Sequence, residues 1–354
     1  SRTVSGYDFL GPVDTHWHTF GYDVGMMNEF YELKKGETVR NIRMYNSESV
    51  ILTDIGKKRN YYVGEDFGCS MFLSYYGGKK LCGASLTVRL FTGEKLHAVS
   101  RFNLHDIENG EIESIAKFTC TLPHTNKAAE MKLYATVESD NFFAENEWEL
   151  YLFPKTENKS YDNVTVLNEA NESILTELLE QGKNVVLLGS KPFASLALSW
   201  RIALAGRTSG NLATVIYDHP VFCDFPHDGF CGWQFAGLTE GGSAVCFEGT
   251  EAKFDPIIEV ASTHKYIIRQ SALFEFSCLS GKLIVCSLNF NDADPAANML
   301  KDRIIGYASG NNFNPKNHIG KKELLSLINA DVKKAFANTN VAFNTNDKTA
   351  IRKK

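Results

Sequence analysis

The stretch VTVLNEANESILTELLEQGKNVVLLGS, residues 164–190, decides the fold of the second half of this chain. It starts with a short apolar run, continues with apolar residues at helical spacing, and ends with the uninterrupted apolar run 184–188. Asn171 is suited to cap the start of the helix and Gly182 to end it. Strand, helix and buried strand in that order predict a βαβ unit within a mostly parallel sheet.

Further strand-like runs and two helical segments follow this unit. The strand-like runs are ATVIYDHP, SAVCFEG, HKYIIRQ, ALFEFSC and KLIVCSLNF. One helix is predicted to start near Asp294, with Pro295 in its first turn, and a shorter helix covers KKELLSLINA. We therefore expect an α/β domain over residues 160–335, followed by a polar tail over 336–354.

The preceding segment, residues 46–155, changes to the two-residue period of half-buried strands. Its runs are SVILTD, CSMFLSYYG, ASLTVRLF, KFTCTLP, EMKLYATVES and EWELYLFP, separated by Gly, Asn, Asp and Pro. Short strands at this spacing predict an antiparallel β-sandwich of immunoglobulin-like type. Residues 1–45 are too short to bury a core and are expected to form an extended connector.

Composition is that of a globular multidomain protein. The chain has 354 residues, 44% of them hydrophobic and 22% charged, and its formal charge of −5 is spread along the sequence. Because no basic stripe is present, we expect no nucleic-acid partner. No window reaches the roughly 18 apolar residues that a membrane span requires, and no signal peptide is recognisable, so no membrane partner is expected.

The cysteines indicate the compartment. All eight lie mostly within apolar, strand-like runs: Cys69, Cys82, Cys120, Cys223, Cys231, Cys246, Cys278 and Cys286. Buried free thiols behave as small hydrophobic groups and are typical of a reducing environment. The sequence therefore predicts a cytoplasmic protein.

The opening stretch GPVDTHWHTF, residues 11–20, raises the question of a metal site. On a strand, Asp14, His16 and His18 would point to the same face and could present their ligand atoms to one ion. The remaining histidines are scattered singly, without the spacing of a ligand pair. We therefore favour polar residues at a strand end or in a loop, and predict no metal and no cofactor.

Two candidate catalytic groups are rejected on their surroundings. Ser190 follows a buried strand, but Pro192 comes where a nucleophile elbow would continue into its helix. Glu29 follows Asn28, as the acid does in many retaining glycosidases, but nothing after it builds the barrel that holds a second carboxylate about 5 Å away. Glu29 is expected at the surface or in an interface.

The densest candidate binding segment is VFCDFPHDGFCGWQF, residues 221–235. It combines five aromatic residues with two acids, an imidazole and an amide: Asp224, His227, Asp228, Trp233 and Gln234 are its chemically informative members. Aromatic faces with carboxylates and amides are typical of saccharide-binding surfaces. The structural alternative is a loop whose Phe and Trp side chains pack onto the sheet.

Five motifs together resemble the C-terminal part of a bacterial glycoside hydrolase of the family 2 type. They are GPVDTHWHTFGY, MNEFYELKKGETV, ENEWELYLFP, HPVFCDFPHDGFCGWQF and GKLIVCSLNFNDADPAANMLKDRIIGYA. The resemblance implies the end of a catalytic (β/α)₈ barrel and then an immunoglobulin-like sandwich. It also implies a flavodoxin-like α/β domain similar to class I glutamine amidotransferases but without their nucleophile.

The resemblance gives the opening stretch another role. Trp17 matches the position of a sugar platform after the last barrel strand, and His16 and His18 would flank it at the rim of the cleft. The strands with the catalytic glutamates would lie upstream of residue 1. The resemblance therefore implies that this chain contains no catalytic residues.

We predict an ancillary region of a glycoside hydrolase that supports an upstream catalytic barrel and its substrate cleft. Its expected carbohydrate-binding residues are His16, Trp17, His18, Asp228 and Trp233, and self-association is left open. A first alternative is a free-standing carbohydrate-binding protein that uses Trp17, Phe230 and Trp233. A second is a metal-dependent hydrolase built on His16 and His18.

Overall fold

The computed structural model describes residues 11–14, 25–155, 161–199, 211–262 and 268–332. The chain divides into two compact units. Unit 1 contains residues 1–59, 63–124 and 129–152, and unit 2 contains residues 60–62, 125–128 and 153–354. No helix among the described residues is both long enough and apolar enough to cross a lipid bilayer.

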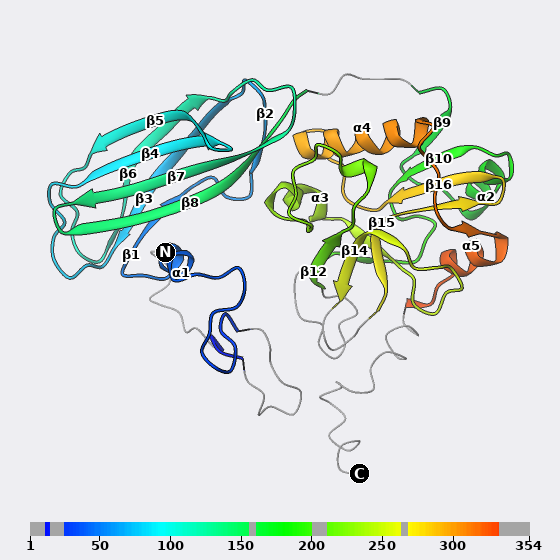
Figure 1. The fold of residues 1–354 in the computed structure, drawn as a ribbon, viewed down its shortest axis with the longest axis horizontal. Helices are drawn as coiled ribbons and strands as arrows, with labels where there is room; N and C mark the ends of the chain where they lie inside the picture. The colour runs from blue at the N-terminus through cyan, green and yellow to red at the C-terminus, as the bar shows by residue number, and fades with distance from the viewer. Residues whose placement is uncertain (1–10, 15–24, 156–160, 200–210, 263–267, 333–354) are drawn as a thin grey trace, which may run out of the picture. The chain divides into compact units, whose positions relative to one another are not determined.

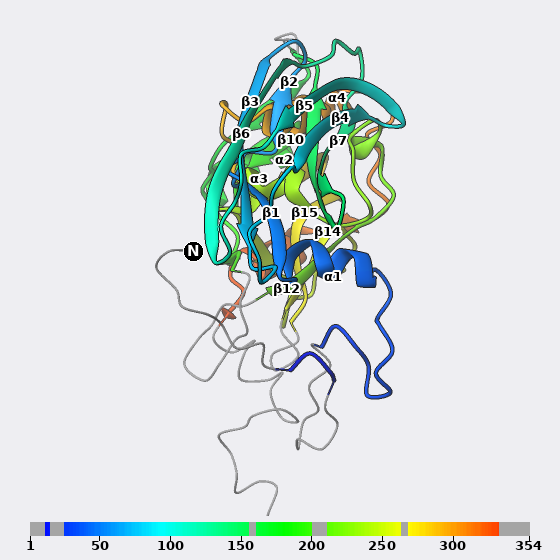
Figure 2. The same cartoon turned by 90° about the vertical axis from the view of Figure 1, so that its left-hand side faces the viewer.

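Unit 1 is built from antiparallel strands in two sheets (Figures 1 and 2). One sheet has the order β1-β3-β6, with β1 (Ser49–Thr53), β3 (Asp66–Tyr75) and β6 (Glu111–Thr121). In the other, β8 (Phe142–Phe153), β7 (Ala129–Ser139), β4 (Ser85–Thr92) and β5 (Lys95–Asn103) follow one another. The two sheets contact each other through β1 and β7 and through β4, β5 and β6.

Alternation along these strands fills the core of unit 1. On β3 every second side chain is buried, because successive strand residues point to opposite faces. β4 and β7 follow the same alternation except at Thr87 and Thr136, which are buried as well. The central buried side chains are Met71, Leu73, Leu86, Val88, Leu90, Leu133, Val137 and Leu150. The short helix α1 (Val39–Tyr45) precedes β1, within the segment predicted as an extended connector.

Unit 2 has a nine-stranded mixed sheet with the main order β11-β13-β15-β16-β10-β9. In addition, β14 pairs with β12 and β15, and β17 pairs with β15; the short strand β2 (Asn60–Tyr62) also belongs to this unit. The other strands of unit 2 are β9 (Val164–Leu167), β10 (Asn184–Leu188), β11 (Ser195–Ala197), β12 (Asn211–Ile216), β13 (Ser243–Cys246), β14 (Pro256–Ser262), β15 (Gln270–Cys278), β16 (Gly281–Cys286) and β17 (His318–Ile319).

The βαβ unit forms with the predicted caps. β9 and β10 pair in parallel on either side of α2 (Glu172–Glu180). The Asn171 side chain accepts a hydrogen bond from the Ile174 amide at 2.8 Å, and Gly182 follows the helix with a φ of +76°. Asp294 likewise caps α4 (Pro295–Ser309), and α5 (Lys321–Ile328) is the last described helix.

The predicted fold class is nevertheless wrong, because unit 2 is not a flavodoxin-like α/β domain. Strands account for 41% of the structure and helices for 17%. Parallel pairing continues from β9 through β10 to β16, but β16 is antiparallel to β15, and β15 is antiparallel to β13 and β14. Only the turn Leu279–Ser280 joins β15 to β16, whereas a parallel connection needs a dozen residues or more.

Candidate functional site

Residues 219–235, which lie between β12 and α3 (Ala236–Thr239), are here called the aromatic loop. It contains two single-turn 3₁₀ helices, η1 (Pro220–Phe222) and η2 (Trp233–Phe235). Two hydrogen bonds fasten its middle to β12: the Ile216 amide donates to the Gly229 carbonyl at 2.7 Å, and the Cys231 amide donates to the Thr214 hydroxyl at 2.8 Å. The loop is thus held at several points along its length.

The five aromatic residues of the loop fall into two groups. Phe222, Phe225 and Phe235 are buried, and the ring centroid of Phe225 lies 6.0 Å from that of Phe222 and 5.2 Å from that of Phe235. Phe230 and Trp233, by contrast, are 50% and 47% exposed. Three rings of the loop are therefore buried, and two remain half exposed.

Three of the polar residues singled out in the sequence support the loop. The Gln234 amide donates to the Pro226 carbonyl at 2.8 Å and is buried. His227 accepts a hydrogen bond from the Gly229 amide at 3.0 Å, and Asp224 forms an ion pair with Lys127 at 3.1 Å. Asp228 is exposed, on the same loop as the two solvent-facing rings.

The opening stretch lies largely outside the described residues, which do not include His16, Trp17 or His18. Asp14 is described, and its carboxylate is already engaged: it pairs with Lys34 at 2.7 Å and accepts the Gly25 amide at 2.8 Å. The hydrogen bond from Lys34 holds the pKa of Asp14 below its ordinary value. Within the described parts of the chain, no three His, Cys, Asp or Glu side chains are arranged to hold a metal ion.

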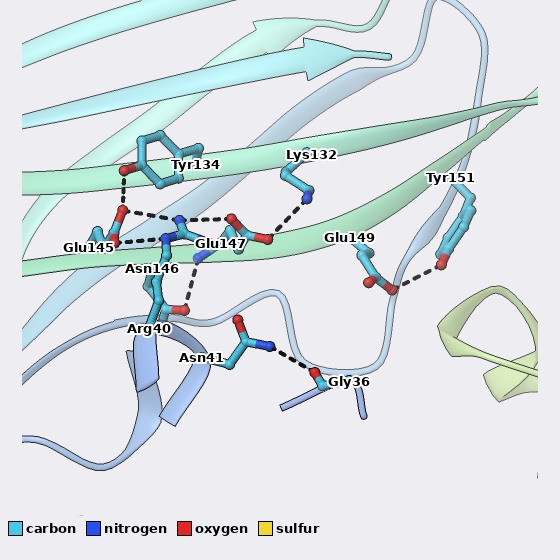
Figure 3. A network of polar contacts seen from close by, with 10 residues as sticks. All are labelled: Gly36, Arg40, Asn41, Lys132, Tyr134, Glu145, Asn146, Glu147, Glu149 and Tyr151. Atoms are coloured by element: carbon cyan, nitrogen blue, oxygen red, sulfur yellow. Dashed lines mark hydrogen bonds and ion pairs between the residues drawn. The ribbon is translucent and has the colours of Figure 1, made fainter. Parts of the chain in front are cut away.

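A charged network on unit 1 was not anticipated from the sequence (Figure 3). Arg40 of α1 binds both carboxylate oxygens of Glu145, at 2.8 and 3.0 Å, and also reaches Glu147 at 3.0 Å. Lys132 pairs with Glu147 at 3.0 Å, and the Tyr134 hydroxyl donates to Glu145. These contacts fix α1 to strands β7 and β8.

The network disfavours acid–base catalysis by its carboxylates. Hydrogen bonds from Arg40 hold the pKa of Glu145 below its ordinary value. Burial alone would raise the pKa of Glu147, but hydrogen bonds from Lys132 and Arg40 outweigh burial and lower it. A general acid near neutral pH needs the opposite shift. The sequence points to this network only through the spacing of Glu145 and Glu147, which places both carboxylates on one face of β8.

Two protein families match parts of the chain. Residues 65–154 match a family described as "Domain of unknown function (DUF8488)", and residues 165–329 match one described as "Domain of unknown function (DUF8487)". No curated protein matches the chain in sequence.

Similar solved structures come from several kinds of protein. A β-glucuronidase from Parabacteroides merdae is 10% identical, with a TM-score of 0.22, over 40% of this chain and 21% of that chain. A family 123 glycoside hydrolase from Clostridium perfringens is 7% identical, with a TM-score of 0.23, over 38% and 32%. A CARDB domain from Pyrococcus furiosus is 12% identical, with a TM-score of 0.23, over 30% and 94%. TM-scores this low establish no shared fold.

Proposed function

We propose that this chain is a non-catalytic, carbohydrate-binding region of the kind that accompanies glycoside hydrolase barrels, and that the aromatic loop is its sugar-contacting surface. The observation that carries the proposal is the division of the loop's aromatic rings. Three buried rings hold the loop in place, and Phe230 and Trp233 remain half exposed on it.

A sugar presents both C–H groups and hydroxyls, and the aromatic loop offers a partner for each. Stacking of an aromatic ring against C–H groups removes apolar surface from water, while a nearby carboxylate accepts hydrogen bonds from hydroxyls. Trp233 and Phe230 supply the rings, and Asp228 supplies the carboxylate. A loop that is already fixed loses little conformational entropy when ligand binds, which favours affinity.

The non-catalytic part of the proposal is supported by the charged network of unit 1. Glycosidases need one carboxyl group with a raised pKa opposite a second one. Glu145 and Glu147 instead have lowered pKa values and cationic partners. In this proposal, a separate catalytic barrel carries out hydrolysis and this region supports it. The free cysteine thiols favour a cytoplasmic location for the protein.

Isothermal titration of the full chain against a panel of neutral oligosaccharides tests the proposal. We expect saturable binding to at least one of them, and at least tenfold weaker binding by Trp233→Ala. Phe143→Ala is the matched control, because it removes another exposed aromatic ring, from unit 1. Its affinity should match that of the unaltered protein.

Two results would overturn the proposal. One is the absence of binding to every member of the panel. The other is equal affinity in the Trp233→Ala variant and the unaltered protein, which would show that the exposed ring does not contact sugar.

A further inference from the structure

A polar pocket of about 380 Å³ lies in unit 2 at the carboxyl ends of three parallel strands. Asn168 directly follows β9, Gly189 and Ser190 follow β10, and Asn289 follows shortly after β16. Lys301 of α4 also lines the pocket. Parallel strands end at the same edge of a sheet, so chain segments distant in sequence meet here.

The helices around this edge explain why the pocket exists. α2 follows β9 and packs with α5 on one face of the sheet, where Leu175, Leu179 and Leu324 share a core with Val185 and Leu187. α4 follows β16 and contacts β10 and β9, while its residues take no part in that core. α2 and α4 thus leave β9 and β16, the strands on either side of β10, toward opposite faces of the sheet, and a crevice opens at the carboxyl ends of these parallel strands.

Close backbone packing shapes the pocket wall. At Gly189, a Cβ atom would lie 2.3 Å from the Asn168 carbonyl oxygen. The chain after β10 can therefore approach the chain after β9 only with glycine at this position. Gly242 makes a similar approach, since its Cβ would lie 2.8 Å from the Leu238 carbonyl oxygen.

The lining is rich in hydroxyl and amide groups and carries no unbalanced charge. Its hydroxyls come from Ser190, Ser243 and Ser287, and its amides from Asn168 and Asn289. The hydroxyls of Ser243 and Ser287 already donate to each other's backbone carbonyls, so they can only accept from a ligand. The one cationic side chain, Lys301, is paired with Asp292 at 3.3 Å. Hydroxyls and amides both donate and accept hydrogen bonds, and so match the hydroxyls of a neutral ligand.

Several of these groups have hydrogen-bonding capacity to spare. Among the described residues, the side chains of Asn168 and Ser190 form no hydrogen bond. The Asn289 amide nitrogen donates to the Glu240 carbonyl at 2.9 Å, which leaves its oxygen to accept. The volume lies near the lower end of the range for ligand pockets, about 300 to 1,000 Å³.

We infer that this pocket binds a neutral polyhydroxylated ligand the size of one monosaccharide, held by hydrogen bonds rather than by stacking. The site is separate from the sugar-contacting surface proposed above, because none of its lining residues belongs to the aromatic loop. The inference stands whether or not the aromatic loop binds sugar.

The test titrates the full chain with glucose, galactose, mannose and N-acetylglucosamine, using glucuronate as a charged comparison. For at least one neutral sugar, we expect saturable shifts of the backbone amide resonances of Gly189, Ser190 and Asn289. The paired variant Asn168→Ala/Ser190→Ala should bind that sugar at least tenfold more weakly. Phe143→Ala, which removes an exposed ring from unit 1, should stay within twofold of the unaltered protein, and glucuronate should bind more weakly than the neutral sugar.

Two results would overturn the inference: no saturable shift with any neutral sugar, or equal affinity in the paired variant and the unaltered protein. The resonance shifts of the unaltered protein decide the matter if the paired variant fails to fold. Oligosaccharide binding that depends on Trp233 without any monosaccharide binding would refute this pocket and keep the proposed function. The reverse result would keep the pocket and refute the aromatic loop.

Discussion

The aromatic loop of unit 2 and helix α1 of unit 1 are both short segments fixed to a sheet, but by different means. The loop is anchored by three buried phenylalanine rings, whereas α1 buries no residue and is held by Arg40 and its carboxylate partners. Apolar anchors leave the remaining side chains of a segment available to solvent. When ion pairs anchor a segment, their charged groups are no longer available for binding or catalysis. The strength of these ion pairs also depends on pH and salt concentration.

The largest effect is expected from the loop's anchor. Phe235→Ala removes a fully buried ring and should lower the free energy of unfolding by about 3–5 kcal/mol. Urea unfolding followed by tryptophan fluorescence measures the change. Phe230→Ala is the control, since loss of an exposed ring should change stability by less than about 0.5 kcal/mol. Equal decreases in the free energy of unfolding of both variants would contradict the conclusion that Phe235 anchors the loop and Phe230 does not.

A smaller effect is expected from the charged anchor. Arg40→Met should lower the free energy of unfolding by about 1 kcal/mol, because a half-exposed ion-pair network is weaker than a buried ring. The same variant should make the chain around α1 more sensitive to limited proteolysis. Lys58→Met serves as control, because it breaks an exposed ion pair with Glu65 and should cost about 0.3 kcal/mol or less. If Lys58→Met lowers the free energy of unfolding as much as Arg40→Met does, the network stabilises the fold no more than a single surface ion pair.

The contribution of Arg40 should also depend on pH in a defined direction. Because the folded-state pKa of Glu145 is lowered, its stabilisation is fully present above the ordinary carboxyl value of 4.5 and is lost as the pH falls through the folded pKa. The difference in stability between Arg40→Met and the unaltered protein should therefore shrink between about pH 7 and about pH 3. The difference in stability between Phe235→Ala and the unaltered protein should change much less over the same pH range. A constant Arg40 difference across this range would argue against the ion pairs.

The smallest effect is expected at Asp228. This carboxylate is exposed, so Asp228→Asn should leave the free energy of unfolding unchanged within about 0.5 kcal/mol. If the aromatic loop contacts sugar as proposed, its affinity for an oligosaccharide should fall about threefold, since one hydrogen bond is weakened. Titration of the two proteins under identical conditions measures this, and unchanged affinity would remove Asp228 from the binding surface.

Local features of the fold were predictable from the sequence, and pairings between distant strands were not. Asn171, Gly182 and Asp294 mark helix ends because capping depends on neighbouring backbone groups. The prediction of a mostly parallel sheet was wrong. The short Leu279–Ser280 connection between β15 and β16 favours an antiparallel hairpin. Helix α1 was missed because it buries no side chain and so leaves no apolar period.

The candidate site was predictable in composition but not in arrangement. Segment 221–235 was identified from its aromatic and polar residues, yet the sequence does not distinguish the buried Phe222 from the exposed Phe230. That distinction depends on which rings pack together, as Phe222 does with Phe225 and Phe235. The polar pocket was not anticipated, because its lining residues come from segments far apart in the chain.

The place of β10 between β9 and β16 has a consequence for synthesis on the ribosome. Its two neighbours differ greatly in sequence distance: Asn184 pairs with Val164 on one side and with Lys282 on the other. During translation the apolar strand NVVLL therefore has β9 beside it early, while its second edge stays unpaired until β16 emerges. Until then, the unpaired edge of β10 can pair with a strand of another chain.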